Sequence, residues 1–201
     1  MTLIKWVTCA VTDTDGFHTG QSGWGELRAR PGFLGQSGGW SRNTPGYAHV
    51  FGLWHDHAAY RAFMAGPHDR LAAAQAGTYR SIEVRLFEAI ETGLSAAGLV
   101  RLAHCRVHPG LDHDFVRAQQ TVWTPGMAAA PGFRGCSFGT ADAPGRPGQI
   151  EFLVLSGWAS AADHDLYRRD RFPGLYRRSG AAGHLAAIDG DLIDTVPEWT
   201  V

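Results

Sequence analysis

The chain has 201 residues, of which 44% are hydrophobic and 18% are charged, with a formal net charge of −1 and a pI near 6.8. This composition is typical of a chain that folds around a packed core, and it argues against intrinsic disorder. Nucleic-acid-binding proteins usually carry a basic patch and a high pI, so we expect no nucleic acid among the partners. No run of about 18 apolar residues is present and the first residues are too polar for a signal peptide, so we expect no membrane span and a cytoplasmic location.

The first half of the chain alternates strand and helix signals. Its strand segments are rich in β-branched and aromatic residues, and Asp56 is a good N-cap for a helix that carries Tyr60, Phe63, Met64 and Leu71 at helical spacing. The expected elements are a strand at 3–11, a glycine-rich and therefore weak helix at 17–29, a strand at 33–40, a loop at 41–46, a strand at 47–54, the helix that Asp56 opens, and a strand at 79–87.

The same order of elements restarts after a linker at 91–98. The expected elements are a strand at 99–107, a helix at 111–123, a strand that begins at the second Pro-Gly-Phe segment, a longer hairpin loop at 141–148, a strand at 149–158, a helix at 163–178 and a closing strand at 189–196. Cys105 corresponds to Cys9, Arg101 to Lys5 and Trp158 to Trp54. The chain is therefore expected to be a tandem duplication.

One phrase, Pro-Gly-Phe-x-Gly-x-Ser-x-Gly, occurs at Pro31 to Gly39 and again at Pro131 to Gly139, an offset of 100 positions. We interpret it as the register mark of the duplication, with no chemistry of its own. The difference in residue number between corresponding positions grows from 96 to 100 to 104 along the chain. The second half therefore contains insertions, which we place in the loops between strands and helices. Each repeat reads β-α-β-β-α-β, the ferredoxin-like order.

The predicted fold class is α+β, with two tandem ferredoxin-like βαββαβ repeats that form an intramolecular dimeric α/β-barrel. The expected repeats cover residues 1–92 and 97–201. A sheet with both helices on one face leaves its other face bare, so we expect the two halves to pair as a pseudo-dimer enclosing a cavity. A further homodimer is left open.

A resemblance to a known family rests on four segments of the first half: Gly-Phe-Leu-Gly-Gln-Ser-Gly-Gly-Trp (32–40), Phe-Gly-Leu-Trp (51–54), Ala-Tyr-Arg-Ala-Phe-Met (59–64) and His-Asp (68–69). Together they resemble the YdbC-like family of unknown function, within the dimeric α/β-barrel superfamily that includes the antibiotic biosynthesis monooxygenases. The second half is similar but diverged, and Phe172 stands where His68 would be.

The wider superfamily includes cofactor-free oxygenases, haem-degrading oxygenases, polyketide cyclases, chlorite dismutases and aldoxime dehydratases. The resemblance implies a site in a cavity between sheet and helices, and in related proteins a histidine near the position of His68 points into the pocket. An activity inferred in this way rests on analogy of fold.

His68 and His104 are the candidate catalytic residues. His104 lies in the middle of a strand where the first repeat has Thr8, and a neutral imidazole there could act as a general base near pH 7. Each histidine is weighed about equally against a buried structural role. Either would be the axial ligand if haem were bound.

The expected substrate-binding residues are Trp6, Thr8, Trp54, Trp158 and Tyr167. Aromatic walls suit a planar apolar ligand, and Thr8 is the polar residue of the first strand that corresponds to His104. Core packing alone is an alternative explanation of the tryptophans. Arginines 168, 169, 171, 177 and 178 form a basic group that would either face solvent or bind a carboxylate such as a haem propionate.

No metal-site or cofactor motif is present. The three cysteines form no Cys-x-x-Cys pair, and no P-loop or dinucleotide fingerprint occurs. We therefore expect a small-molecule enzyme, a cofactor-free monooxygenase or a cyclase, acting on an aromatic or polyketide-like substrate. The alternatives are a haem enzyme of the same fold and a non-catalytic ligand-binding or stress-related domain.

Overall fold

The computed structural model describes residues 1–141 and 150–201. The order β-α-β-β-α-β occurs twice, so the predicted α+β class with two tandem ferredoxin-like repeats is confirmed. The hairpin loop predicted at 141–148 lies, except for Ala141, outside the described residues.

Helices and strands of the first repeat follow the predicted order closely. Asp56 caps its helix as expected, because its Oδ1 accepts the Ala59 N–H at 2.8 Å. The elements are β1 (Leu3–Val11), α1 (Thr14–Ser22), the 3₁₀ helix η1 (Gly23–Ala29), β2 (Phe33–Ser41), β3 (Tyr47–Trp54), α2 (His57–Met64), α3 (His68–Ala73) and β4 (Tyr79–Thr92).

The second repeat has a π-helical turn that the first lacks. Its elements are β5 (Leu99–Val107), α4 (Asp112–Ala118), the π turn η2 (Gln119–Trp123), α5 (Thr124–Ala128), β6 (Phe133–Ala141), β7 (Ile150–Trp158), α6 (Ala161–Asp170), α7 (Phe172–Ser179), α8 (Ala181–His184), β8 (Leu185–Thr195) and the 3₁₀ helix η3 (Pro197–Trp199).

Two long helices predicted from the sequence are each broken in the structure. The expected helix after Asp56 divides into α2 and α3 at Gly66-Pro67, and the expected helix at 163–178 divides into α6 and α7 before Pro173. Proline has no N–H to donate and its ring clashes with the preceding turn, so a new helix begins there. The weak helix expected at 17–29 is α-helical only to Ser22.

The chain divides into two compact units that differ from the repeats at the strand ends. Unit 1 comprises Met1–Ala89 and Ile193–Val201, and unit 2 comprises Ile90–Leu192. The last residues of β8 thus belong to unit 1, where they pair with Gly39–Ser41 of β2, and the end of β4 belongs to unit 2.

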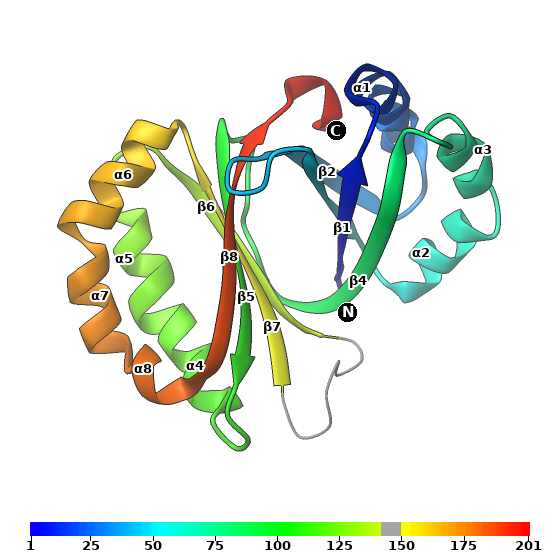
Figure 1. The fold of residues 1–201 in the computed structure, drawn as a ribbon. Helices are drawn as coiled ribbons and strands as arrows, with labels where there is room; N and C mark the ends of the chain where they lie inside the picture. Colours follow the sequence, from blue (N-terminus) through cyan, green and yellow to red (C-terminus); the bar gives the residue numbers. More distant parts are fainter. Residues whose placement is uncertain (142–149) are drawn as a thin grey trace. The chain divides into compact units, whose positions relative to one another are not determined.

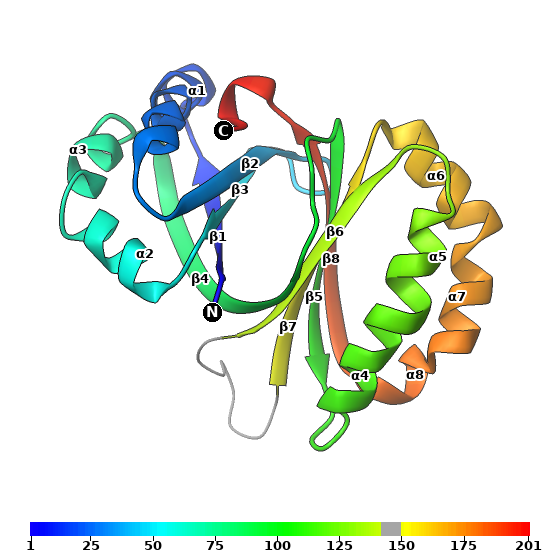
Figure 2. The ribbon, with the colours of Figure 1, turned by 180° about the vertical axis from the view of Figure 1, so that it is seen from behind.

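Each unit is an antiparallel sheet with its helices on one face (Figures 1 and 2). In unit 1 the strand order is β4-β1-β3-β2, with the end of β8 beside β2; in unit 2 it is β8-β5-β7-β6, with the end of β4 beside β6. The central ladders pair Leu3 with Trp54 in unit 1 and Leu99 with Trp158 in unit 2. Side chains alternate along a strand, so every second side chain of a central strand faces the helices and the side chains between them face the opposite side of the sheet.

The repeated Pro-Gly-Phe phrase forms a turn followed by a strand irregularity. Gly32 and Gly132 have φ values of +75° and +73°, and each carbonyl accepts an N–H from the residue after the neighbouring strand, at 2.7 Å in both cases. Register shifts follow at Phe33/Gly35 in β2 and at Phe133/Cys136 in β6. The phrase therefore marks a conformation that both units need.

Replacing Gly132 with alanine is expected to lower the free energy of unfolding by at least about 1–2 kcal/mol, because the left-handed backbone disfavours a Cβ. A Cβ there would also overlap the Asp163 side chain. Chemical denaturation checks this, with Gly174→Ala in α7 as the matched control. No atom outside its own helix and chain neighbours lies within 4 Å of a Gly174 Cβ, so alanine should be neutral or slightly stabilising there. Equal stability of Gly132→Ala and the parent would contradict the assignment.

Candidate functional site

Each unit contains a pocket between its sheet and its helices. The unit 1 pocket has a volume of about 370 Å³ and the unit 2 pocket about 360 Å³, sizes typical of small-molecule sites. Lys5, Val7 and Cys9 of β1 face the unit 1 pocket, and Arg101, Ala103 and Cys105 of β5 face the unit 2 pocket. The repeat that the sequence shows thus gives two corresponding pockets.

Lys5 is the main polar group on the strand side of the unit 1 pocket. It is the only lysine in the sequence, and its side chain makes no hydrogen bond or ion pair within the described part of the chain. Its Nζ lies 5.5 Å from the centre of the Trp24 ring and 5.8 Å from that of Tyr60. Burial lowers the pKa of Lys5 to about 8, and the nearby Cys9 opposes that shift. Lys5 can therefore stabilise an anionic ligand at pH 7 and lose its proton slightly above it.

A hydrogen-bonded group of three side chains forms the helix side of this pocket. Trp24 Nε1 donates to Gln75 Oε1 and Gln75 Nε2 donates to Gln21 Oε1, both at 3.0 Å. Gln21 is 4% exposed, and its Nε2 is without a hydrogen-bond partner among the described residues. An amide donor is thus left over in a pocket that also holds a cation.

His68 and Trp54, both predicted site residues, line the unit 1 pocket. The His68 ring lies edge-on to Phe63 at 5.5 Å and to Trp24 at 6.0 Å, measured between ring centres. Its Nδ1 is 2.9 Å from Asp69 Oδ1, which orients the ring and directs Nε2 as the other reactive nitrogen. The structure therefore brings His68 into one pocket with Lys5.

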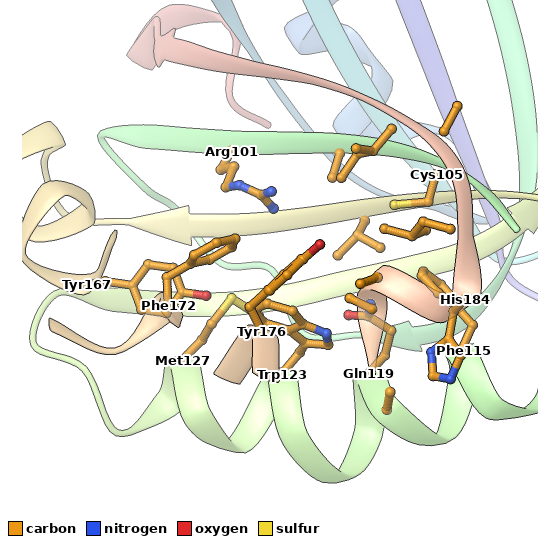
Figure 3. Close-up of a pocket in the computed structure, with 18 residues that line it drawn as sticks. Arg101, Cys105, Phe115, Gln119, Trp123, Met127, Tyr167, Phe172, Tyr176 and His184 are labelled. Carbon is orange, nitrogen blue, oxygen red and sulfur yellow. The ribbon is translucent and has the colours of Figure 1, made fainter. Parts of the chain in front are cut away.

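Tyr167 lines the unit 2 pocket, so the structure separates it from His68 and Trp54 (Figure 3). Burial raises the pKa of Tyr167 to about 12. Trp158, the counterpart of Trp54, is fully buried and stacks on Tyr167 with ring centres 4.7 Å apart. Its Nε1 donates to Ser156 Oγ at 3.2 Å, so core packing accounts for it.

The remaining predicted residues face away from both pockets. His104 lies between Ala103 and Cys105, and alternation along β5 therefore turns it to the other face of the sheet. Its Nε2 is 2.8 Å from Glu151 Oε2, and both side chains are 6% exposed. A catalytic role for His104 stays a prediction. The buried pair with Glu151 offers a structural role instead, and the stability of variants measures that role.

Trp6 and Thr8 lie on the corresponding face of β1. Trp6 Nε1 donates to His49 Nδ1 at 3.1 Å, and Thr8 Oγ1 lies 3.3 Å from the same nitrogen. Neither is among the residues that line the unit 1 pocket. Their role in substrate binding stays a prediction.

Sequence reasoning noted the pair Lys5 and Arg101 but gave it no function, and it missed Gln21 and Gln119. A signal for the glutamines was present: both first helices contain Phe-x-x-small-Gln followed by tryptophan, at Phe17 to Trp24 and at Phe115 to Trp123. The second half has one more residue between the glutamine and the tryptophan. The wider π turn at Gln119–Trp123 accommodates that extra residue.

Metal binding has little support in the described residues. Residues 1–141 and 150–201 hold no group of three or more histidine, cysteine or acidic side chains placed to bind an ion. All three cysteines are free and buried, and burial raises the pKa of each thiol to about 12. None of the helices in those ranges is both long and apolar enough to cross a membrane.

Comparison with known proteins gives a domain match for the first half and a fold match for the whole chain. Residues 3–87 match the model of a domain of unknown function, DUF4937. No curated protein matches the sequence.

Three solved structures show the fold. A candidate monooxygenase from Lactobacillus acidophilus is 15% identical, with a TM-score of 0.74 over 100% of this chain and 95% of its own. An anthrone oxidase-like protein is 15% identical, with a TM-score of 0.65 over 97% and 91%. A candidate chlorite dismutase is 13% identical, with a TM-score of 0.62 over 99% and 97%. The predicted dimeric α/β-barrel fold class, built from two ferredoxin-like repeats, is confirmed.

Proposed function

We propose that the unit 1 pocket is the active site of an enzyme that deprotonates a planar, weakly acidic aromatic or polyketide-like compound and lets its carbanion react with dioxygen. The observation that carries the proposal is Lys5, a buried cation without a carboxylate partner among the described residues, between two aromatic rings. A buried positive charge of this kind stabilises negative charge that develops on a substrate, and the low local polarity strengthens the effect.

The steps balance without a further reactant. His68 Nε2 accepts a proton from an activated CH₂ group, and Lys5 pairs with the enolate oxygen that results. The carbanion gives one electron to dioxygen and the two radicals combine to a peroxide anion. His68 returns its proton to give the hydroperoxide, and loss of water leaves a carbonyl. The substrate CH₂ becomes C=O, one oxygen atom enters the product and the other leaves as water.

Anthrone is a suitable probe, since it has the acidic CH₂ and the planar shape, and a structural neighbour is described as anthrone oxidase-like. The full chain is expected to form anthraquinone and consume oxygen faster than the enzyme-free control. Lys5→Met should lower kcat/KM by about 10²–10³-fold, and His68→Gln by about 10²-fold. Oxygen uptake and product absorbance measure both.

His55→Gln is the matched control, because His55 has the same Nδ1 pairing with the adjacent aspartate, at 3.0 Å, but a 72% exposed side chain. It should retain parent activity. Turnover no faster than the enzyme-free reaction, or full activity in Lys5→Met and His68→Gln, would remove the proposal. Binding of anthrone without oxygen uptake would instead support the non-catalytic ligand-binding alternative.

A haem enzyme is the second candidate, favoured by one observation: the Nδ1 bond to Asp69 leaves His68 Nε2 as the nitrogen that could hold an iron. Bound haem would supply redox chemistry at its iron. The arginines predicted for the propionates belong to α6, α7 and the residue between them in unit 2, whereas His68 belongs to unit 1. Adding haemin should give a sharpened, red-shifted Soret band that His68→Ala removes if this candidate is right, and only the broad band of free haemin if it is wrong. Membership of the YdbC-like family also stays a proposal.

A further inference from the structure

We propose that the unit 2 pocket is a second, independent ligand site, selective for a planar aromatic compound that carries a carboxylate. It is distinct from the unit 1 pocket, where the proposed ligand is only weakly acidic. Three observations carry this inference: an unpaired cation on β5, an amide of the π turn without a hydrogen-bond partner among the described residues, and a wall of aromatic rings from the π turn and α7.

The cation is Arg101, at the position that corresponds to Lys5. Its half-buried side chain lines the unit 2 pocket and makes no hydrogen bond or ion pair within the described residues. No aspartate or glutamate is among the residues described as lining this pocket. Arginine stays protonated at all ordinary pH values and presents two parallel N–H groups that match a carboxylate.

The amide is Gln119, which is 6% exposed and also lines the pocket. Within residues 1–141 and 150–201 neither its side chain nor the Trp123 Nε1 forms a hydrogen bond, and neither is among the polar atoms that are fully buried without a partner. Both N–H groups are therefore accessible from the pocket and free to donate to a ligand. Both residues lie at the ends of the π turn, a conformation often found at functional sites.

The indole of unit 1 has a protein partner that the indole of unit 2 lacks. In unit 1 Gln75 accepts from the Trp24 indole and donates to Gln21 Oε1, while Gln21 Nε2 is without a partner among the described residues. The residue that corresponds to Gln75 is Ser179, whose Oγ donates to the Tyr176 carbonyl at 3.0 Å instead. The unit 2 pocket therefore presents N–H donors from Arg101, Gln119 and Trp123 without protein acceptors among the described residues. An anionic ligand supplies acceptors for such donors.

The walls suit a flat ring system. Phe172 stacks on Tyr176 with ring centres 5.9 Å apart and lies 5.4 Å from the Trp123 ring. Figure 3 shows Arg101 on the strand side of the pocket, with these rings on the helix side. The pocket volume of about 360 Å³ accommodates a two-ring compound. One cation in a mostly apolar lining favours a singly charged carboxylate over a phosphate.

The test is calorimetric titration of the full chain with 2-naphthoate and with 2-naphthamide, which has nearly the same shape but no charge. The parent protein should bind 2-naphthoate at one site, at least tenfold more tightly than the amide. Arg101→Met should abolish that preference, and Arg101→Lys should keep part of it, because lysine retains charge but not the paired N–H geometry. Gln119→Leu should weaken 2-naphthoate about tenfold.

Arg168→Met is the matched control, since it removes an exposed arginine of α6 that does not line the pocket, and it should leave 2-naphthoate binding unchanged. Thermal unfolding of each variant establishes that it is folded. Equal affinity for the two probes in the parent, full 2-naphthoate binding in folded Arg101→Met, or loss of binding in Arg168→Met would each overturn the proposal. Naphthyl phosphate bound more tightly than 2-naphthoate would also overturn it. No turnover is measured, so failure here is separate from failure of the anthrone reaction.

Discussion

Replacing His104 with leucine is expected to lower the free energy of unfolding by about 3–5 kcal/mol, because it leaves the Glu151 carboxylate buried without this partner. The two side chains are each 6% exposed and 2.8 Å apart between Nε2 and Oε2. Urea-induced unfolding at pH 7 measures the change. If His104 serves the fold rather than a reaction, anthrone turnover in the folded fraction should be unaltered.

The double variant His104→Leu/Glu151→Leu should recover a large part of that loss, because removing both members of a buried pair costs less than removing one. Thr8→Val is the matched control in the first repeat. Thr8 lies at the corresponding strand position and its hydroxyl is 3.3 Å from His49 Nδ1, so losing it should cost only about 1 kcal/mol. A His104→Leu protein as stable as the parent would show that the pair contributes nothing to folding.

Replacing Lys5 with methionine is expected to raise the free energy of unfolding by about 2–3 kcal/mol at pH 7, after allowance for the lost contacts with the Trp24 and Tyr60 rings. The gain arises because burial disfavours the charged form of Lys5 and lowers its pKa from 10.5 to about 8. A binding or catalytic group that destabilises the folded protein is typical of a functional site.

The pH dependence has a definite sign. Below about pH 8, Lys5 is protonated in the folded and the unfolded chain, so the folded state carries the full cost of the buried charge. Between about pH 8 and pH 10.5 only the unfolded chain keeps the proton, so the parent becomes more stable as pH rises. The advantage of Lys5→Met should shrink across this range and vanish above it.

Because Lys5 is the only lysine, reductive ¹³C-methylation gives one dimethyl-lysine NMR signal beside that of the amino terminus. Its titration should report a pKa near 8, below the ordinary value of 10.5. Mild denaturant that unfolds the chain should return the signal to the ordinary value. A folded-state pKa at or above 10.5, together with no gain in stability for Lys5→Met, would contradict the buried, unpaired cation.

The repeat was predictable because its signals are local. The Pro-Gly-Phe phrase contains a glycine with left-handed backbone at Gly32 and Gly132, so both halves keep the same residues there. Helix breaks were misjudged because Pro67 and Pro173 interrupt segments whose apolar spacing continues across them. Similarly, β4 extends to Thr92, beyond the predicted end at Phe87, because its last residues pair in unit 2.

The site was harder to predict because it depends on which face of a strand meets the helices. Both faces of β5 are largely buried, with His104 at 5% and Cys105 at 3% exposed, so burial pattern alone cannot assign the pocket side. His104 drew attention as a polar residue in an apolar strand, and the same argument would have selected Lys5 and Arg101. Only the observed alternation, with Lys5 facing Trp24, distinguishes them.

The carboxyl-terminal residues Ile193–Val201 have a consequence for the order of synthesis. Trp199 is fully buried among Phe17, Trp40 and other residues of unit 1, and Gln36 donates to its carbonyl at 3.1 Å. The ribosome therefore delivers this piece of the unit 1 core after every residue of unit 2. The core of unit 1 is therefore completed only when Trp199 has been synthesised. All residues of unit 2 are available for folding before that point.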